Sequence, residues 1–350
     1  MEMYLTPKEV YGVLKTVVKT DNVPFIWGSP GIGKSALCKQ LATEMNMELV
    51  HYDAPLLEPT DLIIPWIDKD TKTVKLLTLD MIPQEGNDKA VLVLIDDLPH
   101  ARPSQQIPLM ELFLDRRIGP NKIGRNVKFI VTGNEETDLA GTNNIISPVL
   151  NRMLHIYMTP DLEQWIDIMG SVISDDIIAY LKAFPQHFFD KPKQGVNAFP
   201  TPRSWHMLSK SLKVMESKND DLMRNLAIAT IGSTAAAGFM AFVKYLKGLD
   251  PRKIIENGIM PEDTTRDKLY AIITSVAGFL KQQGVNYVTK FHTNVYSFLQ
   301  KLPAEFRISC MKEMVRTPQG KNRVLLRKLV DFHPDLLDQI AFIFSSGDEK

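Results

Sequence analysis

The residues best suited to chemistry lie in a glycine-rich segment near the amino terminus. Gly28-Ser-Pro-Gly-Ile-Gly-Lys-Ser35 matches the pattern G-x-x-x-x-G-K-[ST] at every fixed position. Glycines let backbone N–H groups curl around phosphate oxygens, a lysine ammonium pairs with the terminal phosphates, and a serine hydroxyl can ligate Mg²⁺. The pattern therefore predicts a nucleotide-phosphate loop made of Gly28, Ser29, Pro30, Gly31, Ile32, Gly33, Lys34, Ser35 and Ala36.

A pair of carboxylates is the second feature that could do chemistry. Asp96 and Asp97 directly follow the apolar run Val91–Ile95. In open α/β sheets, ligands bind at the carboxyl ends of the strands, so both acids are predicted to project toward bound phosphates. We expect Asp96 to help hold Mg²⁺, together with Ser35, and Asp97 to polarise the water that attacks the terminal phosphate.

Both features require an alternating α/β architecture to position them. The phosphate loop follows one predicted strand and opens a predicted helix, which is the context that the motif demands. Strands and helices in alternation indicate an α/β domain with a parallel sheet, and beyond Pro160 helical patterns dominate. The predicted strands are Val23–Trp27, Glu48–Tyr52, Val91–Ile95, Val127–Thr132 and Leu154–Met158, and the predicted helices in this part are Pro7–Lys19, Lys34–Met45 and Ser104–Leu114.

Composition and charge exclude several classes of protein. The 41 basic and 41 acidic residues balance, which disfavours a globally basic nucleic-acid binder but not a local basic groove. Cys38 and Cys310 are too few for a disulfide scaffold or a four-cysteine zinc site, and they favour a reducing, cytoplasmic setting. The histidines show no ligand spacing, so no catalytic metal other than Mg²⁺ is expected.

Two further segments bear on whether the chain contacts a membrane. The amino terminus has no basic start followed by an apolar run, so no signal peptide is predicted. The uncharged run Asn225–Val243 contains threonine, serine and glycine, and it is too polar and too short to predict a spanning helix. We expect it to be a buried helix rich in small residues, and we expect no membrane partner.

The order of these features resembles that of the AAA+ ATPases, in particular the MoxR-like branch with its dynein-related type of AAA+ domain. The resemblance extends from Gly28 to Trp205, about half of the chain. It depends on the phosphate loop, on Leu94–Pro103, which contains the strand-end acids, on Leu109–Arg117, which is similar to the helix before the family's hairpin, and on three later segments. These are Phe129–Asn134, similar to the sensor-1 strand, Ser147–Met153, similar to the segment that carries an arginine finger, and Thr201–Trp205, similar to the sensor-2 element of the lid.

The resemblance implies a fold and a set of catalytic residues. The fold is a P-loop AAA+ domain with a five-stranded parallel sheet over residues 1–160, a helical lid over 161–248 and further helices over 249–350. The implied cofactors are ATP and Mg²⁺. The implied catalytic residues are Lys34, Asp97, Asn134 as sensor 1, Arg152 as arginine finger and Arg203 as sensor 2.

Two positions depart from the family pattern. Asp97 stands where the family usually has glutamate, and the shorter side chain is expected to hold water less well and to slow hydrolysis. Asn134 is followed by Glu135 where the family more often has proline, which leaves Thr132 as an alternative sensor.

The sequence predicts two hairpins inserted into the domain. The resemblance implies that residues 61–80 and 116–128 are the helix-2 insert and the hairpin before sensor 1, which often line a pore in relatives; plain surface hairpins are the alternative. Side chains that could grip a polypeptide or a nucleic-acid backbone are Trp66 in the first, and Arg116, Arg117, Lys122, Arg125 and Lys128 in the second.

The predicted function is ATP hydrolysis coupled to remodelling of a protein partner, in a self-associated ring that is expected to be a hexamer. The resemblance suggests a partner with a von Willebrand type A domain. Two alternatives stay open at this point: a DNA-directed AAA+ motor or loader, and a nucleotide-gated scaffold in which Asp97 has made hydrolysis negligible.

Overall fold

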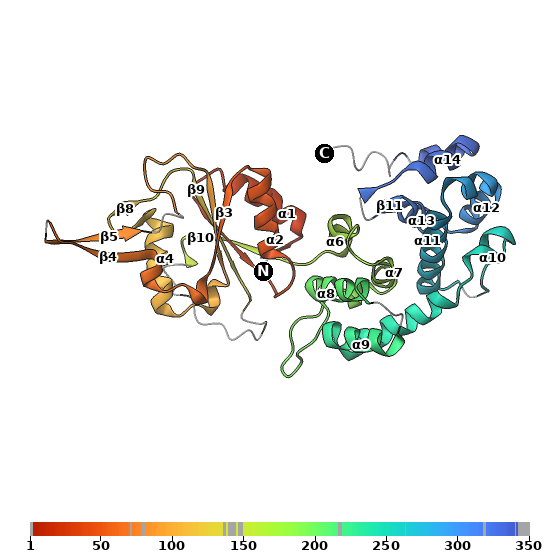
Figure 1. Cartoon of the computed structure of the whole chain (residues 1–350), viewed down its shortest axis with the longest axis horizontal. Helices are drawn as coiled ribbons and strands as arrows, with labels where there is room; N and C mark the ends of the chain where they lie inside the picture. Colours follow the sequence, from red (N-terminus) through yellow and green to blue (C-terminus); the bar gives the residue numbers. More distant parts are fainter. Residues whose placement is uncertain are drawn as a thin grey trace. The chain divides into compact units, whose positions relative to one another are not determined.

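The computed structural model describes residues 3–70, 72–78, 82–135, 138, 145, 150–215, 219–262, 264–317, 320–339 and 341. The chain divides into two compact units, each of which is considered by itself (Figure 1). The α/β unit comprises Met1–Gln164, Lys191–Val196 and Thr201–Arg203, and the helical unit comprises Trp165–Asp190, Asn197–Pro200 and Ser204–Lys350.

A six-stranded sheet forms the centre of the α/β unit, and every neighbouring pair of its strands is parallel. The central strands run through the buried core because their residues are mostly apolar; Val91 to Ile95 are all buried. In order across the sheet they are β1 (Tyr4–Leu5), β10 (Met153–Met158), β2 (Val23–Trp27), β9 (Val127–Gly133), β6 (Val91–Asp96) and β3 (Glu48–Asp53).

The predicted α/β class with a parallel sheet is confirmed, and each predicted strand is present to within a residue at either end. The predicted number of five strands is wrong, because β1 adds a sixth. This strand pairs with β10 only through Tyr4 and Leu5. Two residues produce no apolar run or alternation, so the sequence pattern contains no signal for it.

Helices cover both faces of the sheet (Figure 1). On one face α4 (Pro103–Leu114) contributes Leu109 and Leu112 to the buried apolar cluster that also contains Val93 and Ile95 of β6. On the other face lie α1 (Pro7–Val17) and α2 (Lys34–Glu44), which contact each other, and α2 also contacts β3, β6 and β9. Short segments link these elements: 3-10 turns at Ala54–Leu56 and Leu98–His100, and the one-turn helix α3 (Pro59–Leu62).

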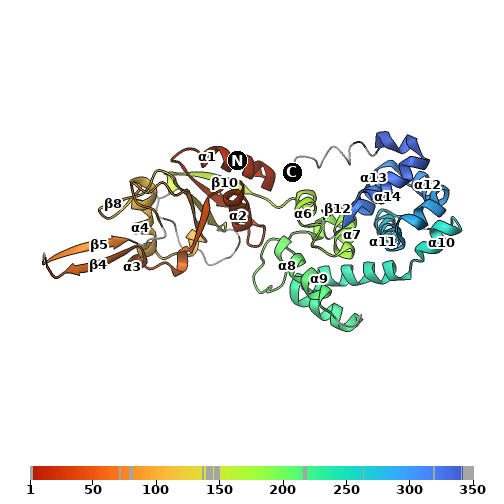
Figure 2. The same cartoon turned by 45° about the horizontal axis from the view of Figure 1, so that its top comes forward.

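Two antiparallel hairpins extend from the α/β unit, at the predicted positions. The longer one pairs β4 (Ile63–Asp68) with β5 (Thr73–Thr78) and projects away from the sheet (Figure 2). The shorter one pairs β7 (Arg117–Ile118) with β8 (Asn121–Lys122) directly after α4.

The helical unit has its own apolar core, in which residues of its last five helices pack together. Asp175 on its second helix accepts hydrogen bonds from Lys281 Nζ at 3.0 Å and Arg316 Nη2 at 2.8 Å. The elements are α6 (Leu162–Met169, which begins in the α/β unit), α7 (Asp175–Ala183), α8 (Pro202–Lys213), α9 (Asp220–Gly248), α10 (Pro251–Glu256), α11 (Arg266–Lys290), α12 (His292–Lys301), α13 (Ala304–Val315), a short hairpin of β11 (Arg316–Thr317) and β12 (Gly320–Lys321), and α14 (Val324–Phe332). The division into a lid and a C-terminal region at residue 248 stays a prediction.

Helix α9 contains the uncharged run Asn225–Val243. Among the described residues it is the one helix long and apolar enough, by length and composition, to cross a membrane. Its backbone is not helical at Gly232, where φ is 79° and a Cβ would lie 2.4 Å from the carbonyl oxygen of Ala198. The break divides α9 into two shorter helices, and Ala227, Ala235 and Phe239 are buried inside the helical unit, as expected for a core helix.

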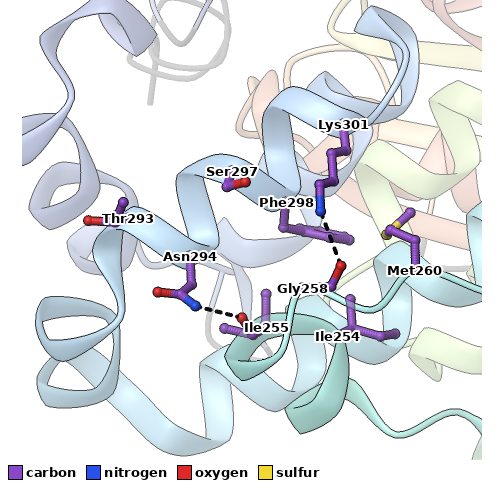
Figure 3. A pocket seen from close by; sticks show the side chains of 9 residues that line it. All are labelled: Ile254, Ile255, Gly258, Met260, Thr293, Asn294, Ser297, Phe298 and Lys301. Atoms are coloured by element: carbon purple, nitrogen blue, oxygen red, sulfur yellow. Dashed lines mark hydrogen bonds between the residues drawn. The ribbon is translucent and has the colours of Figure 1, made fainter.

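A pocket of about 240 Å³ opens between α10 and α12 of the helical unit (Figure 3). Lys301 Nζ donates to the carbonyl oxygen of Gly258 at 3.1 Å, and Asn294 Nδ2 donates to that of Ile255 at 3.0 Å. These two long polar side chains therefore satisfy carbonyl groups at the end of α10, which is a structural role.

Candidate nucleotide-binding site

The phosphate loop connects β2 to α2 at the carboxyl end of the sheet. Gly31 and Gly33 have φ values of 80° and 104°, a left-handed conformation that glycine adopts without steric cost. The carbonyl oxygen of Gly31 accepts a hydrogen bond from the N–H of Arg203 at 3.1 Å. Because α2 begins at Lys34, its amino-terminal N–H groups and dipole favour an anion at this loop.

Lys34 is the buried centre of the site. Its Nζ donates to the carbonyl oxygens of Gly28 at 2.5 Å and Ser29 at 3.2 Å, and to Asn134 Oδ1 at 2.9 Å. Burial lowers the pKa of Lys34 from 10.5 to about 8, since a low-dielectric environment disfavours the ammonium. The carboxylate of Asp97, followed by those of Asp96 and Asp138, acts in the opposite direction.

Asp96 ends β6 beside the start of α2. Ser35 Oγ donates to Asp96 Oδ2 at 2.6 Å, and Thr132 Oγ1 donates to Oδ1 of the same carboxylate. Burial by itself raises the pKa of Asp96, but the hydrogen bonds from Ser35 and Thr132, with the nearby charge of Lys34, outweigh it and the pKa lies below its ordinary value. An ionised carboxylate next to a hydroxyl fits the oxygen ligands that Mg²⁺ requires.

Asp97 is the residue after β6, and its backbone is left-handed, with φ 57° and ψ 39°. Aspartate and asparagine adopt this conformation more readily than other side chains. The N–H of Asp97 donates to Thr132 Oγ1 at 3.4 Å, and the charge of its carboxylate is the largest of those that act to raise the pKa of Lys34. Ser35 is therefore a direct hydrogen-bond partner of Asp96, whereas Asp97 acts on Lys34 through its charge.

Asn134 and Thr132, the two candidate sensors, both reach the site from β9. Since β9 lies between β2 and β6, its carboxyl end is adjacent to the loop and to the acids. Asn134 is buried and contacts Lys34, whereas Thr132 is buried and contacts Asp96. The structure thus gives them different partners within one site.

Arg203 is brought to the loop by the short segment Thr201–Arg203. In addition to the backbone hydrogen bond at Gly31, its positive charge acts to lower the pKa of Lys34. A Cβ added at Gly31 would lie 3.3 Å from the Cβ of Arg203, so the loop glycine also allows this close approach. The arginine side chain itself is exposed.

Arg152 is not part of this site. It is exposed and immediately precedes β10, whose first residue, Met153, pairs with Val23 at the start of β2. The phosphate loop follows the other end of β2, and a strand of five residues spans roughly 16 Å. Arg152 therefore lies at the amino-terminal end of β2, whereas the phosphate loop of the same chain lies at the carboxyl end. The first residues of the arginine-finger segment, Ser147 to Val149, lie outside the described residues.

Three residues near the loop were not identified by sequence reasoning. Ser29 Oγ donates to Asp138 Oδ1 at 2.9 Å, and Asp138 is only 1% exposed, so burial raises its pKa. Glu135 Oε2 accepts from Tyr4 Oη at 2.9 Å and from Lys191 Nζ at 3.4 Å. His51 Nε2 lies 3.2 Å from Asp96 Oδ2. None of them belongs to a motif, and each acquires its partner only when distant segments come together.

The basic residues of the second hairpin are largely engaged within the chain. Arg116 Nη2 donates to the carbonyl oxygens of Gly124 and Val127 at 2.9 and 2.8 Å. Ion pairs join Arg117 to Glu111 at 2.9 Å, Lys122 to Glu85 at 3.9 Å and Lys128 to Asp21 at 3.2 Å. In the first hairpin Trp66 is 59% exposed.

Residues 24–160 match the model of the AAA family, the ATPase family associated with various cellular activities. The matched range begins in β2 and ends just after β10, so it contains the loop, both acids and both candidate sensors. The α/β unit therefore contains an AAA domain, a family whose members bind nucleotides. The MoxR-like subtype that the sequence suggested stays a prediction. No match was found among the curated proteins.

Several solved structures are similar at low sequence identity. A putative ATPase from Cytophaga hutchinsonii is 13% identical, with a TM-score of 0.36, over 88% of this chain and 81% of that one. The RuvB Holliday junction branch migration motor of Thermotoga maritima is 15% identical, with a TM-score of 0.34, over 77% and 80%. NtrX of Brucella abortus is 13% identical, with a TM-score of 0.34, over 90% and 68%. Since these TM-scores are below 0.5, the family assignment depends on the match over residues 24–160 alone.

Proposed function

We propose that this chain, whose residues 24–160 form an AAA domain, is a Mg²⁺-dependent ATPase that remodels a protein partner and works as a hexameric ring. The observation that carries the proposal is the convergence of separate segments on the phosphate loop. Lys34 contacts Asn134, Ser35 contacts Asp96, and the backbone of Arg203 is bonded to Gly31.

Binding would begin with an exchange of hydrogen bonds at Lys34. Its ammonium now donates to the loop carbonyls of Gly28 and Ser29, and phosphate oxygens are stronger, charged acceptors. The turn through Gly31 and Gly33 and the start of α2 present backbone N–H groups to the same phosphates. Ser35 and Asp96 would hold Mg²⁺, which neutralises phosphate charge when it is bound.

Hydrolysis would then depend on Asp97 and on residues that recognise the terminal phosphate. Asp97 follows the metal-binding acid directly and acts on Lys34 through its charge, so its carboxylate is suited to polarise the attacking water. Asn134 is held beside the loop through its side-chain oxygen by Lys34, and its amide N–H groups would contact the water or the terminal phosphate. Arg203 would add positive charge from the other side of the loop.

The position of Arg152 supports a ring. Arg152 is exposed and lies at the end of the strands opposite its own loop. It can therefore act on a terminal phosphate only in a neighbouring chain. Such an arginine stabilises the charge of the transition state, typically by several orders of magnitude in rate. Each site would then be complete only when two chains meet, which requires head-to-tail assembly.

A polypeptide is favoured over a nucleic acid as the partner because of the two hairpins. In the first, Trp66, Ile67 and Val74 are more than half exposed, an apolar surface of the kind that contacts protein. In the second, most basic side chains are neutralised by acids or carbonyls of the same chain, which reduces the charge available for phosphates. A cytoplasmic location and a partner with a von Willebrand type A domain are parts of the same proposal.

A steady-state ATPase assay tests the proposal. The purified chain should release phosphate from ATP only with Mg²⁺, and Lys34→Ala should be inactive. Stimulation by double- or single-stranded DNA would favour a DNA-directed motor instead. Tight ATP binding without turnover, at protein concentrations where rings form, would indicate a nucleotide-gated scaffold.

A further inference from the structure

A histidine and two carboxylates meet at the carboxyl ends of β3 and β6. His51 and Asp53 are two residues apart on β3, so both side chains point to the same face of the sheet. Asp53 is directly opposite Asp96 in the parallel pairing of β3 with β6. The three ligand-type atoms, one from each side chain, lie within 4.8 Å of one another.

The spacing of these atoms suits a single metal ion. His51 Nε2 lies 3.2 Å from Asp96 Oδ2 and 3.5 Å from Asp53 Oδ1. Ligands bound at about 2.1 Å from one ion are roughly 3.0 to 3.5 Å apart, for bond angles between octahedral and tetrahedral. The Asp53 side chain is 57% exposed, so its rotation can adjust the third distance without disturbing the core.

The ligand set differs from that of a simple Mg²⁺ site. Mg²⁺ takes oxygen ligands and keeps several waters, whereas an imidazole nitrogen suits the divalent ions of the first transition series. The Asp96 side chain is only 13% exposed and is held by Ser35 and Thr132, so one ligand is fixed in place. The exposed sides of His51 and Asp53 leave room for water in the remaining positions.

We propose that His51, Asp53 and Asp96 form a binding site for a divalent transition-metal ion that can be occupied without nucleotide. The site shares Asp96 with the proposed Mg²⁺ site but requires neither ATP nor hydrolysis. It would make the chain prefer an ion such as Mn²⁺ to Mg²⁺ beside the phosphate loop. An imidazolium ion paired with the two carboxylates is the competing explanation for the same distances.

Binding of Mn²⁺ alone to the nucleotide-free protein tests the proposal. The electron paramagnetic resonance signal of free Mn²⁺ should show one bound ion per chain, and displacement by Mg²⁺ should need at least about a tenfold higher concentration. His51→Ala and Asp53→Asn should each weaken Mn²⁺ binding by about tenfold or more. His51→Asp, which replaces the nitrogen with an oxygen ligand, should keep cation binding and lose the preference for Mn²⁺ over Mg²⁺.

Two controls separate this proposal from its alternatives. Glu48→Gln removes an exposed acid at the other end of β3, where it pairs with Lys89, and should bind Mn²⁺ like the parent protein. Lys34→Ala should lose ATP binding and keep Mn²⁺ binding, so a failure of the ATPase proposal and a failure of the metal site are distinguishable. Absence of Mn²⁺ binding to the parent protein would overturn the proposal in favour of the ion pair. Unchanged Mn²⁺ binding in His51→Ala would overturn it in favour of a site made by Asp96 and Ser35 alone.

Discussion

The Lys34 ammonium donates a hydrogen bond to the side-chain oxygen of Asn134 at 2.9 Å, so the lysine of the phosphate loop and the candidate sensor are direct partners. Both side chains are buried. An ammonium has three N–H donors, so Lys34 can exchange its two loop carbonyls for phosphate oxygens and keep its bond to Asn134. This contact links the phosphate loop to the residue that follows β9.

The lowered pKa of Lys34 predicts that ATP affinity depends on pH. The ammonium loses its proton as the pH rises through about 8, whereas an ordinary lysine keeps it to 10.5. Phosphates bind the charged form, so the dissociation constant of ATP should increase above about pH 8, by up to about tenfold per pH unit. Titration with a fluorescent ATP analogue between about pH 7 and 9.5 measures this. Lys34→Arg, which stays charged, should show a flat profile, and parallel profiles in the two proteins would contradict the role of Lys34.

Asn134 and Thr132 should fail in different ways when they are replaced. Asn134→Ala should keep ATP binding and lower kcat by roughly tenfold to a thousandfold, because a group aimed at the transition state is lost. Thr132→Val removes the hydroxyl that orients Asp96 and should instead raise the Mg²⁺ concentration needed for half-maximal rate. Rates measured across a Mg²⁺ titration distinguish the two. A shifted Mg²⁺ dependence in Asn134→Ala, with normal dependence in Thr132→Val, would reverse the assignment.

Asp97→Asn is expected to separate binding from hydrolysis. Asparagine tolerates the left-handed backbone at this position, so the fold of the turn should be retained. The carboxylate that polarises water is lost while Asp96 and Ser35 still hold Mg²⁺, and kcat should fall by about 10² to 10⁴. Retained ATP with little phosphate release, seen in filter binding and phosphate assays, is the expected result. Equal kcat in Asp97→Asn and the parent protein would show that Asp97 has no part in hydrolysis. In contrast, Asp97→Glu should raise kcat, because it supplies the longer acid.

The position of Arg152 predicts complementation between two inactive variants. Lys34→Ala chains cannot use nucleotide but carry Arg152, and Arg152→Ala chains keep the loop but offer no finger. In mixed rings made from equal amounts, about a quarter of the head-to-tail interfaces would combine an intact loop with an intact finger. Activity should therefore return in part on mixing, and the specific activity of the parent protein should rise with concentration until rings form.

Sizing chromatography of the mixture verifies that rings form, and co-purification of the untagged variant with an affinity-tagged one verifies that the two variants exchange subunits. Arg125→Ala, in the same unit, is the matched control. Its chains keep both loop and finger, so in a mixture with Lys34→Ala each Arg125→Ala chain should hydrolyse ATP as fast as it does alone. Verified mixed rings that stay as inactive as the single variants would show that Arg152 is not a finger in trans.

Much of the nucleotide site was determined by local sequence. The phosphate loop was predictable because its glycines and its lysine have fixed spacing, and because a strand and a helix flank it in the chain. The strands were predictable from continuous apolar runs such as Val91–Ile95, which must be buried on both faces. Asp96 and Asp97 followed from their place at the end of such a run.

Only the tertiary structure decided which side chains meet and which do not. The order of strands, with β9 between β2 and β6, gives Lys34 and Asp96 their partners on β9, and no local pattern contains that order. The parallel pairing of β10 with β2 separates Arg152 from its own loop, and the pairing of β3 with β6 places His51 beside Asp96. The physical reason is that apolar periodicity and turn chemistry act over a few residues, whereas hydrogen bonds and ion pairs between polar side chains depend on contacts between segments a hundred residues apart.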